Sequence, residues 1–262
     1  MYTERNRAQP PKCLNRKPLG CSAGNNERKE SLMITEHRKK LLMLYDDLRV
    51  ADVRDGMDTM IHHRIGSMDP SIRPIFRTRA YGIARTCRYL SFRGTIPSLS
   101  PEEYGKWASQ YYNEVCSYPW INDIQEGDFI VIDQSGVNAG LMGSANTLEC
   151  QGRGARGFIT NGGVRDTDEI IIQEIPFWAP FCSQAMVQGR LAFDAKDIPV
   201  NVGGVQIRPG DIVVADGDGV IVVPHELAED VAKHAHKEHD RDKKDRRESY
   251  RRLGKEEDGT VR

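Results

Sequence analysis

The chain has 262 residues, of which 39% are hydrophobic, and its 37 basic residues nearly balance 38 acidic ones. This balance excludes the global positive field that recruits nucleic acid or an acidic membrane surface. No run approaches the ~18 apolar residues that a membrane helix needs, and the N-terminus lacks the apolar region of a signal peptide. The composition predicts a soluble cytoplasmic protein with one folded domain of ordinary size.

The two ends of the chain differ in composition from its middle. Prolines, glycines and asparagines lie among scattered lysines and arginines in residues 1–30, a composition that buries little apolar surface. We therefore expect a flexible tail over residues 1–30, a folded domain over residues 31–242 and a charged C-terminal extension over residues 243–262.

The first half of the domain is predicted to be mostly helical. Apolar residues recur at helical spacing from Leu32 to Leu48, and a second helix is expected over residues 51–62. A strand is expected from Ile83 to Leu90, followed by a polar helix from Pro101 to Tyr118. That helix carries aromatic side chains at Tyr104, Trp107, Tyr111 and Tyr112. Two interpretations of these aromatics remain open, namely core packing and a lid over a site.

The second half is rich in predicted strands. Short apolar runs predict strands over Phe129–Asp133, Phe158–Thr160, Ile212–Ala215 and Val220–Val223. The last two flank Asp216-Gly217-Asp218-Gly219, which is typical of a hairpin turn. From His225 onward the sequence predicts a densely charged helix. Strands interleaved with helices indicate an α/β fold.

The most informative stretch runs from Gly157 to Asp166 and reads Gly-Phe-Ile-Thr-Asn-Gly-Gly-Val-Arg-Asp. A buried-strand pattern leads into a glycine turn, which delivers Arg165 and Asp166 to the carboxyl end of the strand, where open α/β sheets bind ligands. An arginine fork suits a carboxylate or enolate, and an aspartate suits a hard divalent cation. The alternative is a local ion pair that caps a helical segment over Thr167–Glu174.

Several further motifs agree in order and spacing with one known family. They begin with Val50-Ala51-Asp52-Val53-Arg54-Asp55-Gly56-Met57 and continue with Gly127–Asp133, Gly154–Gly157, Asn161–Asp166 and Pro209–Pro224. Over residues 45–242 the chain resembles the family that contains regulator of ribonuclease activity A and the class II 4-hydroxy-4-methyl-2-oxoglutarate aldolases.

The resemblance implies a fold and a set of site residues. The implied fold is a single layered domain of the swivelling β/β/α type, assembled as a homotrimer or hexamer with sites at subunit interfaces. Arg165 is implied to bind the pyruvyl end of the substrate and Asp166 to bind the metal. The loop Gly143-Ser144-Ala145-Asn146 is implied to cradle the same end of the substrate. Glu238 is the positional match for a glutamate that reaches the neighbouring subunit's site.

Two positions depart from the family pattern. Asn161 stands where an aspartate is usual, and the Gly143–Asn146 loop replaces the usual Gly-(Glu/Asp)-Leu sequence. The first departure removes an acid or base, so a metal-bound water, Glu238 and Asp133 all remain candidates for proton transfer.

The resulting mechanism requires a place for the electrons that are released when a carbon-carbon bond breaks. A divalent ion acting as a Lewis acid supplies it, and few protein ligands favour largely hydrated Mg²⁺ or Mn²⁺ over zinc. The motif region contains no lysine for an imine route.

Three functions are compatible with these residues. The first is a metal-dependent aldolase or decarboxylase, a lyase that releases pyruvate from a 4-hydroxy-2-oxo acid or oxaloacetate. The second is a protein-binding regulator that resembles the ribonuclease E inhibitor. The third is an enzyme of the same fold that acts on another hydroxy or sugar acid, selected by the long segment Ser91–Trp120.

Overall fold

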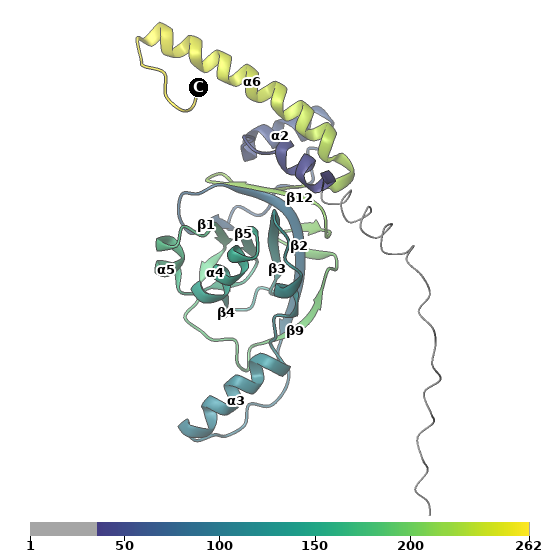
Figure 1. Ribbon diagram of the computed structural model, residues 1–262, viewed down its shortest axis with the longest axis vertical. Coiled ribbons are helices and arrows are strands. Elements are labelled where there is room, and N and C mark those ends of the chain that lie inside the picture. The colour runs from purple at the N-terminus through teal and green to yellow at the C-terminus, as the bar shows by residue number, and fades with distance from the viewer. Residues whose placement is uncertain (1–35, 262) are drawn as a thin grey trace, which may run out of the picture. The chain divides into compact units, whose positions relative to one another are not determined.

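The computed structural model describes residues 36–261 and divides the chain into two units, Met1–His37 and Arg38–Arg262. The elements that are labelled in Figure 1 belong to the second unit. The tail predicted for residues 1–30 lies outside the described residues. Of the predicted helix Leu32–Leu48, the described part is helical over residues 36–44.

The second unit is a mixed α/β fold, as predicted (Figure 1). Its helices are α2 (Val50–Thr59), α3 (Pro101–Glu114), η1 (Pro119–Asp123), α4 (Ser144–Gly152), α5 (Thr167–Ile172), η2 (His225–Leu227) and α6 (Ala228–Leu253). Its strands are β1 (Arg73–Pro74), β2 (Ala80–Ser91), β3 (Asp128–Asp133), β4 (Gly140–Met142), β5 (Ala155–Thr160), β6 (Gly163–Val164), β7 (Phe177–Ala179), β8 (Phe181–Cys182), β9 (Leu191–Lys196), β10 (Val200–Val202), β11 (Val205–Ile207), β12 (Ile212–Asp216) and β13 (Gly219–Val223).

The large sheet has the strand order β1-β7-β5-β3-β2-β12-β13, and β9 also pairs with β2. Strands β2, β3, β5 and β7 are parallel neighbours, whereas β12 and β9 pair with β2 in the antiparallel sense. The chain passes from β3 to its parallel neighbour β5 through β4 and helix α4, because parallel strands need a crossover connection. A separate three-stranded parallel sheet, β4-β6-β8, lies in the same unit.

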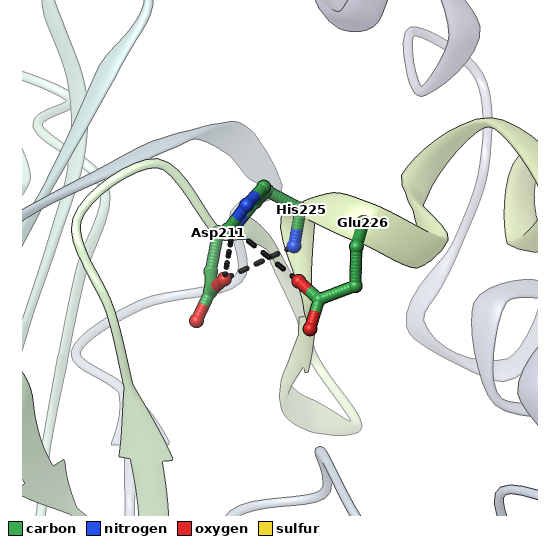
Figure 2. Close-up of side chains that lie close together, drawn as sticks. All are labelled: Asp211, His225 and Glu226. Carbon is green, nitrogen blue, oxygen red and sulfur yellow. Dashed lines mark hydrogen bonds and ion pairs between the residues drawn. The ribbon is translucent and has the colours of Figure 1, made fainter.

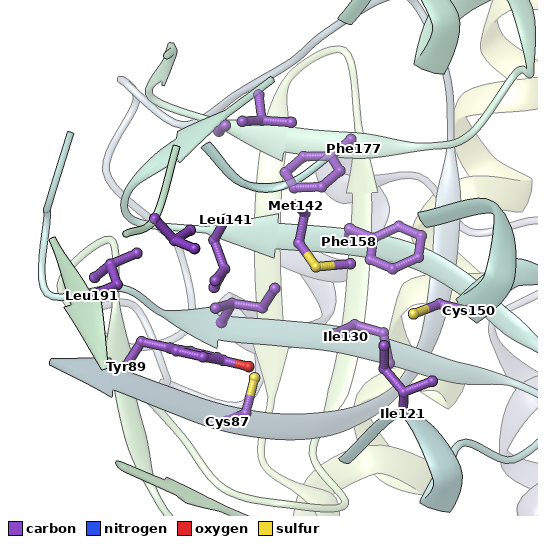
Figure 3. Packing of buried hydrophobic residues seen from close by; sticks show 14 of the residues in the cluster. Cys87, Tyr89, Ile121, Ile130, Leu141, Met142, Cys150, Phe158, Phe177 and Leu191 are labelled. Atoms are coloured by element: carbon purple, nitrogen blue, oxygen red, sulfur yellow. The ribbon is translucent and has the colours of Figure 1, made fainter. Parts of the chain in front are cut away.

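Both faces of the large sheet are buried, which explains the nearly continuous apolar strands. In β3, Ile130 and Ile132 face a cluster that contains Phe158 and Phe177 (Figure 3). Phe129 and Val131 point the other way into a second cluster with Trp178. This alternation with a period of two residues fixes the register of β3, because a slip by one residue would exchange the two faces.

Helices α2 and α6 cover a third cluster formed with β12 and β13. Their backbones approach closely at Gly56, where an added Cβ would lie 2.8 Å from the Val231 carbonyl oxygen and 2.9 Å from the Ala235 nitrogen. A side chain at position 56 would therefore separate the two helices.

Helices α2 and α3 both end earlier than predicted. Helix α2 stops at Thr59, and α3 stops at Glu114 because the chain turns into η1 at Pro119. Helix α6 is continuous to Leu253, so position 242 lies within it. The hairpin turn between β12 and β13 is confirmed by the pairing of Asp216 with Gly219. No helix in residues 36–261 is both long enough and apolar enough to span a membrane.

Candidate active site

Two strands of the small sheet bring the predicted site segments together. Strands β4 and β6 are parallel neighbours, and Met142 pairs with Val164 at their carboxyl ends. The next residues along the chain are Gly143 and Arg165, and the Arg165 amide donates a hydrogen bond to the Met142 carbonyl at 3.1 Å. The loop that begins at Gly143 and the Arg165–Asp166 pair therefore leave the same edge of one sheet.

Two glycines make room for the charged pair. A Cβ at position 143 would lie 2.3 Å from Oδ2 of Asp166, and a Cβ at position 140 would lie 2.6 Å from Cβ and Cγ of Arg165. Contacts this short are forbidden, so the loop reaches the two side chains only because it carries none at these positions. Gly140 and Gly143 hence define where the arginine and the carboxylate lie.

Arg165 and Asp166 form an ion pair, with Nε of Arg165 3.1 Å from Oδ1 of Asp166. Their side chains are 33% and 36% exposed, so both remain accessible to a ligand. Asp166 has a left-handed backbone (φ 55°) and is the N-cap residue of α5, but its side chain makes no capping hydrogen bond. The local ion pair of the alternative interpretation is therefore present, but its side chains do not cap the helix. Aspartate is one of the few non-glycine residues that readily adopt this conformation, because its short polar side chain can bond locally.

The predicted cradle Gly143–Asn146 is the start of helix α4. Gly143 is the extended N-cap residue, and its carbonyl accepts hydrogen bonds from the Thr147 amide and hydroxyl, each at 3.0 Å. The amides of residues 144–146 belong to the first turn and have no partner within the helix. They carry the positive end of the helix dipole, which favours an anionic group.

Asn161 is used for structure. Its Oδ1 accepts the Gln134 amide at 2.7 Å, and its Nδ2 donates to Oδ1 of Asp133 at 2.8 Å and to the Asn201 carbonyl at 3.1 Å. The Asp133 carboxylate also accepts the Ser135 amide at 3.0 Å. An aspartate at position 161 would face Asp133, so the amide there is the chemical partner of that carboxylate. The pair joins the ends of β3 and β5 to the β10 strand.

Gln134 is a site-supporting residue that the sequence did not reveal. It is 1% exposed, and its Nε2 donates to the Ala139 carbonyl at 2.5 Å. Its Oε1 accepts the Thr160 hydroxyl at 3.2 Å, and a Cβ at Gly162 would lie 2.5 Å from its amide carbon. Gln134 therefore links the end of β5 to the loop that precedes Gly140. The only signal in the sequence was a polar residue directly after a fully buried strand.

Glu238 lies on α6, in contact with α2 rather than with α4 or α5 of the same chain. Its side chain is 22% exposed and pairs with Arg241. Partial burial raises the pKa of the nearby Asp55, and the negative charge of Glu238 raises it further, with Asp242 adding to the effect. The structure therefore does not bring Glu238 to Arg165 within one chain, and it places the glutamate in an acidic face formed by Asp55, Glu238 and Asp242.

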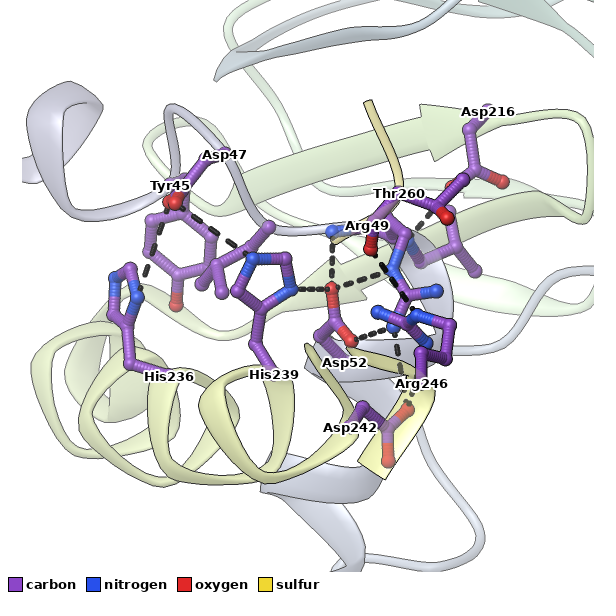
Figure 4. Close-up of polar contacts among 12 residues, drawn as sticks. Tyr45, Asp47, Arg49, Asp52, Asp216, His236, His239, Asp242, Arg246 and Thr260 are labelled. Carbon is purple, nitrogen blue, oxygen red and sulfur yellow. Dashed lines mark hydrogen bonds and ion pairs between the residues drawn. The ribbon is translucent and has the colours of Figure 1, made fainter. Parts of the chain in front are cut away.

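A buried charge network joins the same two helices (Figure 4). The Asp52 carboxylate accepts Nε of Arg49 at 2.9 Å and lies 2.9 Å from Nδ1 of His239. Burial alone would raise the pKa of Asp52, but the hydrogen bonds from Arg49 and His239 outweigh it and hold the pKa below its usual range. This network fixes α6 against α2.

A cluster with metal-ligand chemistry is formed by Asp211, His225 and Glu226 (Figure 2). Both oxygens of Asp211 accept backbone amides, from Arg208 at 2.8 Å and from His225 at 3.0 Å. The Arg208 guanidinium contacts both carboxylates and thus occupies the cluster with positive charge. Asp211 of the Pro209-Gly210-Asp211 motif serves to tie the start of β12 to η2.

The aromatic segment divides between the two predicted roles. Tyr111 is 3% exposed and donates to the Leu191 carbonyl at 2.7 Å. Trp107 packs against Tyr111, and the centroids of the two rings lie 5.3 Å apart. These two residues pack as core. Tyr104 is 42% exposed, and Tyr112 lines a pocket that also includes Asn146 of α4.

Comparisons with known proteins identify the family of this chain. The family model described as RraA-like, Aldolase/RraA, matches residues 50–222. The "Putative 4-hydroxy-4-methyl-2-oxoglutarate aldolase" of Halalkalibacterium halodurans is 35% identical over 119 residues, which cover 42% of this chain and 53% of that protein. Protein DlpA of Legionella pneumophila is 25% identical over 209 residues, which cover 79% of this chain and 31% of that protein. The chain thus matches only part of the length of these relatives.

A solved structure shares the fold. The crystal structure of Streptomyces coelicolor RraAS2, titled an unusual member of the RNase ES inhibitor RraA protein family, has a TM-score of 0.63 at 23% identity, covering 79% of this chain and 96% of that one. The family match spans more than half of the chain and includes both the Gly143 loop and the Arg165–Asp166 pair. The chain therefore belongs to the Aldolase/RraA family.

Proposed function

We propose that this protein is a divalent-metal-dependent carbon-carbon lyase that releases pyruvate from a 4-hydroxy-2-oxo acid or oxaloacetate. The observation that carries the proposal is the close approach of the α4 N-terminus to the Arg165–Asp166 pair, made possible by Gly140 and Gly143. The guanidinium of Arg165, the accessible carboxylate of Asp166 and the N-terminus of α4 meet there. These are the groups that binding of a small 2-oxo acid and its metal ion requires.

Arg165 stabilises the negative charge that develops on the pyruvate enolate when the bond breaks. Within residues 36–261, Asp166 is the group that bonds its guanidinium, and it does so through Nε. The two terminal nitrogens are thereby left to a substrate, where they donate charge-assisted hydrogen bonds in a bidentate fork. The ion pair with Asp166 orients that fork.

Asp166 is the residue that would hold the metal ion. Among the described residues, the cluster of possible metal ligands is formed by Asp211, His225 and Glu226, and it does not include Asp166. The guanidinium of Arg208 already pairs with its carboxylates. A single carboxylate does not suit zinc, which takes three or four protein ligands, but it suits Mg²⁺ or Mn²⁺ that retains most of its waters. When bound, such an ion acts as a Lewis acid on the substrate carbonyl.

The first turn of α4 would bind the carboxylate of the substrate. The amides of Ser144, Ala145 and Asn146 point out of the helix end, and Gly143 keeps that end free of a side chain. Binding by backbone amides tolerates the departure of this loop from the family's usual sequence, because the amides are the same for every residue type.

Proton transfer is assigned to Glu238 acting in the site of a neighbouring copy. Asp133 is held by Asn161 and the Ser135 amide, and Asn161 has no proton to exchange near pH 7. Glu238 instead belongs to an acidic face whose charges repel one another, and unfavourable charge of this kind gathers at functional sites. This role requires a homo-oligomer, either a trimer or a hexamer.

Pyruvate release tests the proposal. Purified protein is supplied with oxaloacetate and a panel of 4-hydroxy-2-oxo acids, with magnesium, with manganese and with EDTA. We expect turnover with either metal, its loss in chelator and its recovery on adding excess magnesium. Turnover that persists unchanged in EDTA would contradict the metal route, and the absence of turnover on every substrate would favour a protein-binding regulator.

A further inference from the structure

The pocket lined by Tyr112 and Asn146 adjoins the first turn of α4. It encloses about 650 Å³ and is lined by Tyr112, Asn113, Ser117, Tyr118, Pro119 and Asn146. Five of these residues come from the end of α3 and the following turn, and Asn146 comes from α4. The segment that the sequence marked as a selector of substrate therefore forms most of the wall.

The hollow lies close to the reacting groups. The Asp166 carboxylate lies where a Cβ on Gly143 would be placed, and Asn146 lies three residues further along the chain, a rise of ~4.5 Å along α4. A substrate whose carboxylate lies at the start of α4 can extend its tail over this distance. The hollow is thus placed to receive the part of the substrate beyond the bond that breaks.

The lining of the hollow is polar but carries no charged side chain. Phenol and alcohol hydroxyls both donate and accept hydrogen bonds, and the two asparagine amides offer separate donors and acceptors. The rings of Tyr112 and Tyr118 are stacked with centroids 6.4 Å apart and provide an apolar surface beside these groups. Such a surface suits a chain of hydroxyl-bearing carbons, whereas a second carboxylate would lose its hydration without gaining a cation.

Tyr118 has a defined role in this wall. Its hydroxyl donates to the Leu141 carbonyl at 2.9 Å and is also hydrogen-bonded to the side chain of Asn146. Burial raises the pKa of Tyr118 well above its usual range, and the facing Asn146 amide acts in the opposite direction. The phenol therefore stays neutral.

We propose that this hollow is a subsite for a neutral, polyhydroxylated tail, so that the enzyme prefers a 4-hydroxy-2-oxo acid derived from a sugar acid over a dicarboxylic one. This inference rests on the proposed lyase function and adds the class of substrate. Tyr112 and Asn113 determine specificity, since both face the tail and neither is part of the reacting group.

Kinetics with matched substrates tests the subsite. The pair consists of 4-hydroxy-2-oxo acids of equal chain length, one with a hydroxylated tail and one with a terminal carboxylate, and oxaloacetate serves as the substrate without a tail. We expect kcat/KM to favour the hydroxylated tail at least ~10-fold, and Tyr112→Phe to lower that value ~10-fold while leaving oxaloacetate unchanged. Tyr104→Phe, on an exposed tyrosine of the same helix, is the control and should change neither. Asn113→Lys should shift the preference toward the dicarboxylic substrate.

A binding measurement separates this inference from the lyase proposal. Calorimetry with a non-cleavable aldonate and with a dicarboxylate of equal length is performed on the wild type and on Tyr112→Phe. Aldonate binding that weakens in Tyr112→Phe supports the subsite even if no substrate is cleaved. A preference for the dicarboxylate, equal effects of Tyr112→Phe on all substrates, or the absence of aldonate binding together with no cleavage of the hydroxylated substrate would overturn it.

Discussion

The edge of the small sheet and the α2–α6 helix pair hold their charges in opposite ways. Between the helices, Asp52 is 1% exposed and is paired with Arg49 and His239. At the sheet edge, Arg165 and Asp166 are about one-third exposed and share a single ion pair. A buried charge must be fully paired for the fold to be stable, whereas a half-exposed charge with unused bonding capacity is free to bind a ligand. The first region keeps the fold together, and the second is suited to chemistry.

Substitution of Arg165 or Asp166 should have the largest effect on activity. Arg165→Lys keeps the charge but loses the fork, and Asp166→Asn keeps the volume but loses the charge that holds a cation. Each should lower kcat/KM at least ~100-fold, or about 3 kcal/mol, while the melting temperature stays nearly constant. The combined loss should be less than additive. Turnover like that of the wild type in either variant would move the chemistry elsewhere.

Substitution of the glycines at the two ends of α4 tests whether activity depends on the close approach of Gly143 to Asp166. Gly143→Ala puts a methyl group where Asp166 Oδ2 lies, so we expect kcat/KM to fall at least ~10-fold, about 1.4 kcal/mol, with the fold intact. Gly152→Ala is the matched control at the other end of α4, because an added Cβ there has no neighbour within 4 Å. Steady-state kinetics and circular dichroism on both variants give the answer. Equal behaviour of the two would contradict the proposed geometry.

Substitution in the buried network of Asp52, Arg49 and His239 should change the stability of the fold and its pH dependence, but not catalysis. Asp52→Asn should lower the free energy of unfolding at pH 7 by about 2 kcal/mol, since hydrogen bonds to a charged group are lost. The pKa of Asp52 is depressed in the folded protein, so its contribution is present above the unfolded value of about 3.9 and is lost as pH falls through the lower folded value. Urea unfolding of both proteins at pH 7 and pH 3 should show the difference shrinking at pH 3. A constant difference would refute this origin.

Asn161 tests whether a carboxylate near the site needs an amide partner for stability. Asn161→Asp would set two carboxylates against each other where Nδ2 now lies 2.8 Å from Asp133, and we expect a loss of about 1–2 kcal/mol of stability. The double variant Asn161→Asp, Asp133→Asn restores one amide and one carboxylate and should recover most of it. Thermal unfolding of the wild type and of these two variants measures the recovery. A double variant no more stable than the single one would show that the pair is not complementary.

Glu238 should give the smallest change in stability. Glu238→Gln removes a charge that raises the pKa of Asp55, but it also removes the ion pair with Arg241, so the free energy of unfolding should change by no more than a few tenths of a kcal/mol, as is usual for surface charges. If Glu238 serves a neighbouring copy, kcat should fall in the same variant. Lys237→Gln, one residue earlier on the exposed side of α6, is the control. Unchanged kcat in Glu238→Gln would remove it from the mechanism.

The sequence predicted the fold and the central pair because their signals are local. Buried strands, the hairpin at Asp216–Gly219 and the Arg165–Asp166 turn depend on neighbouring residues, and the structure follows them. It did not reveal Gln134, or the reason for Asn161, because these depend on groups that lie 27 or 28 residues apart in the chain. Nor could it place Asn146 opposite Tyr118. Such contacts arise only when parallel strands bring their ends together.

Strand β2 has a consequence for how the protein opens. It pairs with β3 over Ile83–Arg88, with β12 over Ala80–Ile83 and with β9 over Cys87–Ser91. Its amides can become accessible to solvent only when strands from both halves of the sheet separate, so their hydrogen exchange should require global unfolding, whereas the edge strand β13 can open locally. We expect β2 to be the last segment to exchange its amide protons for deuterium, and the half-life of that exchange to report the stability of the whole domain.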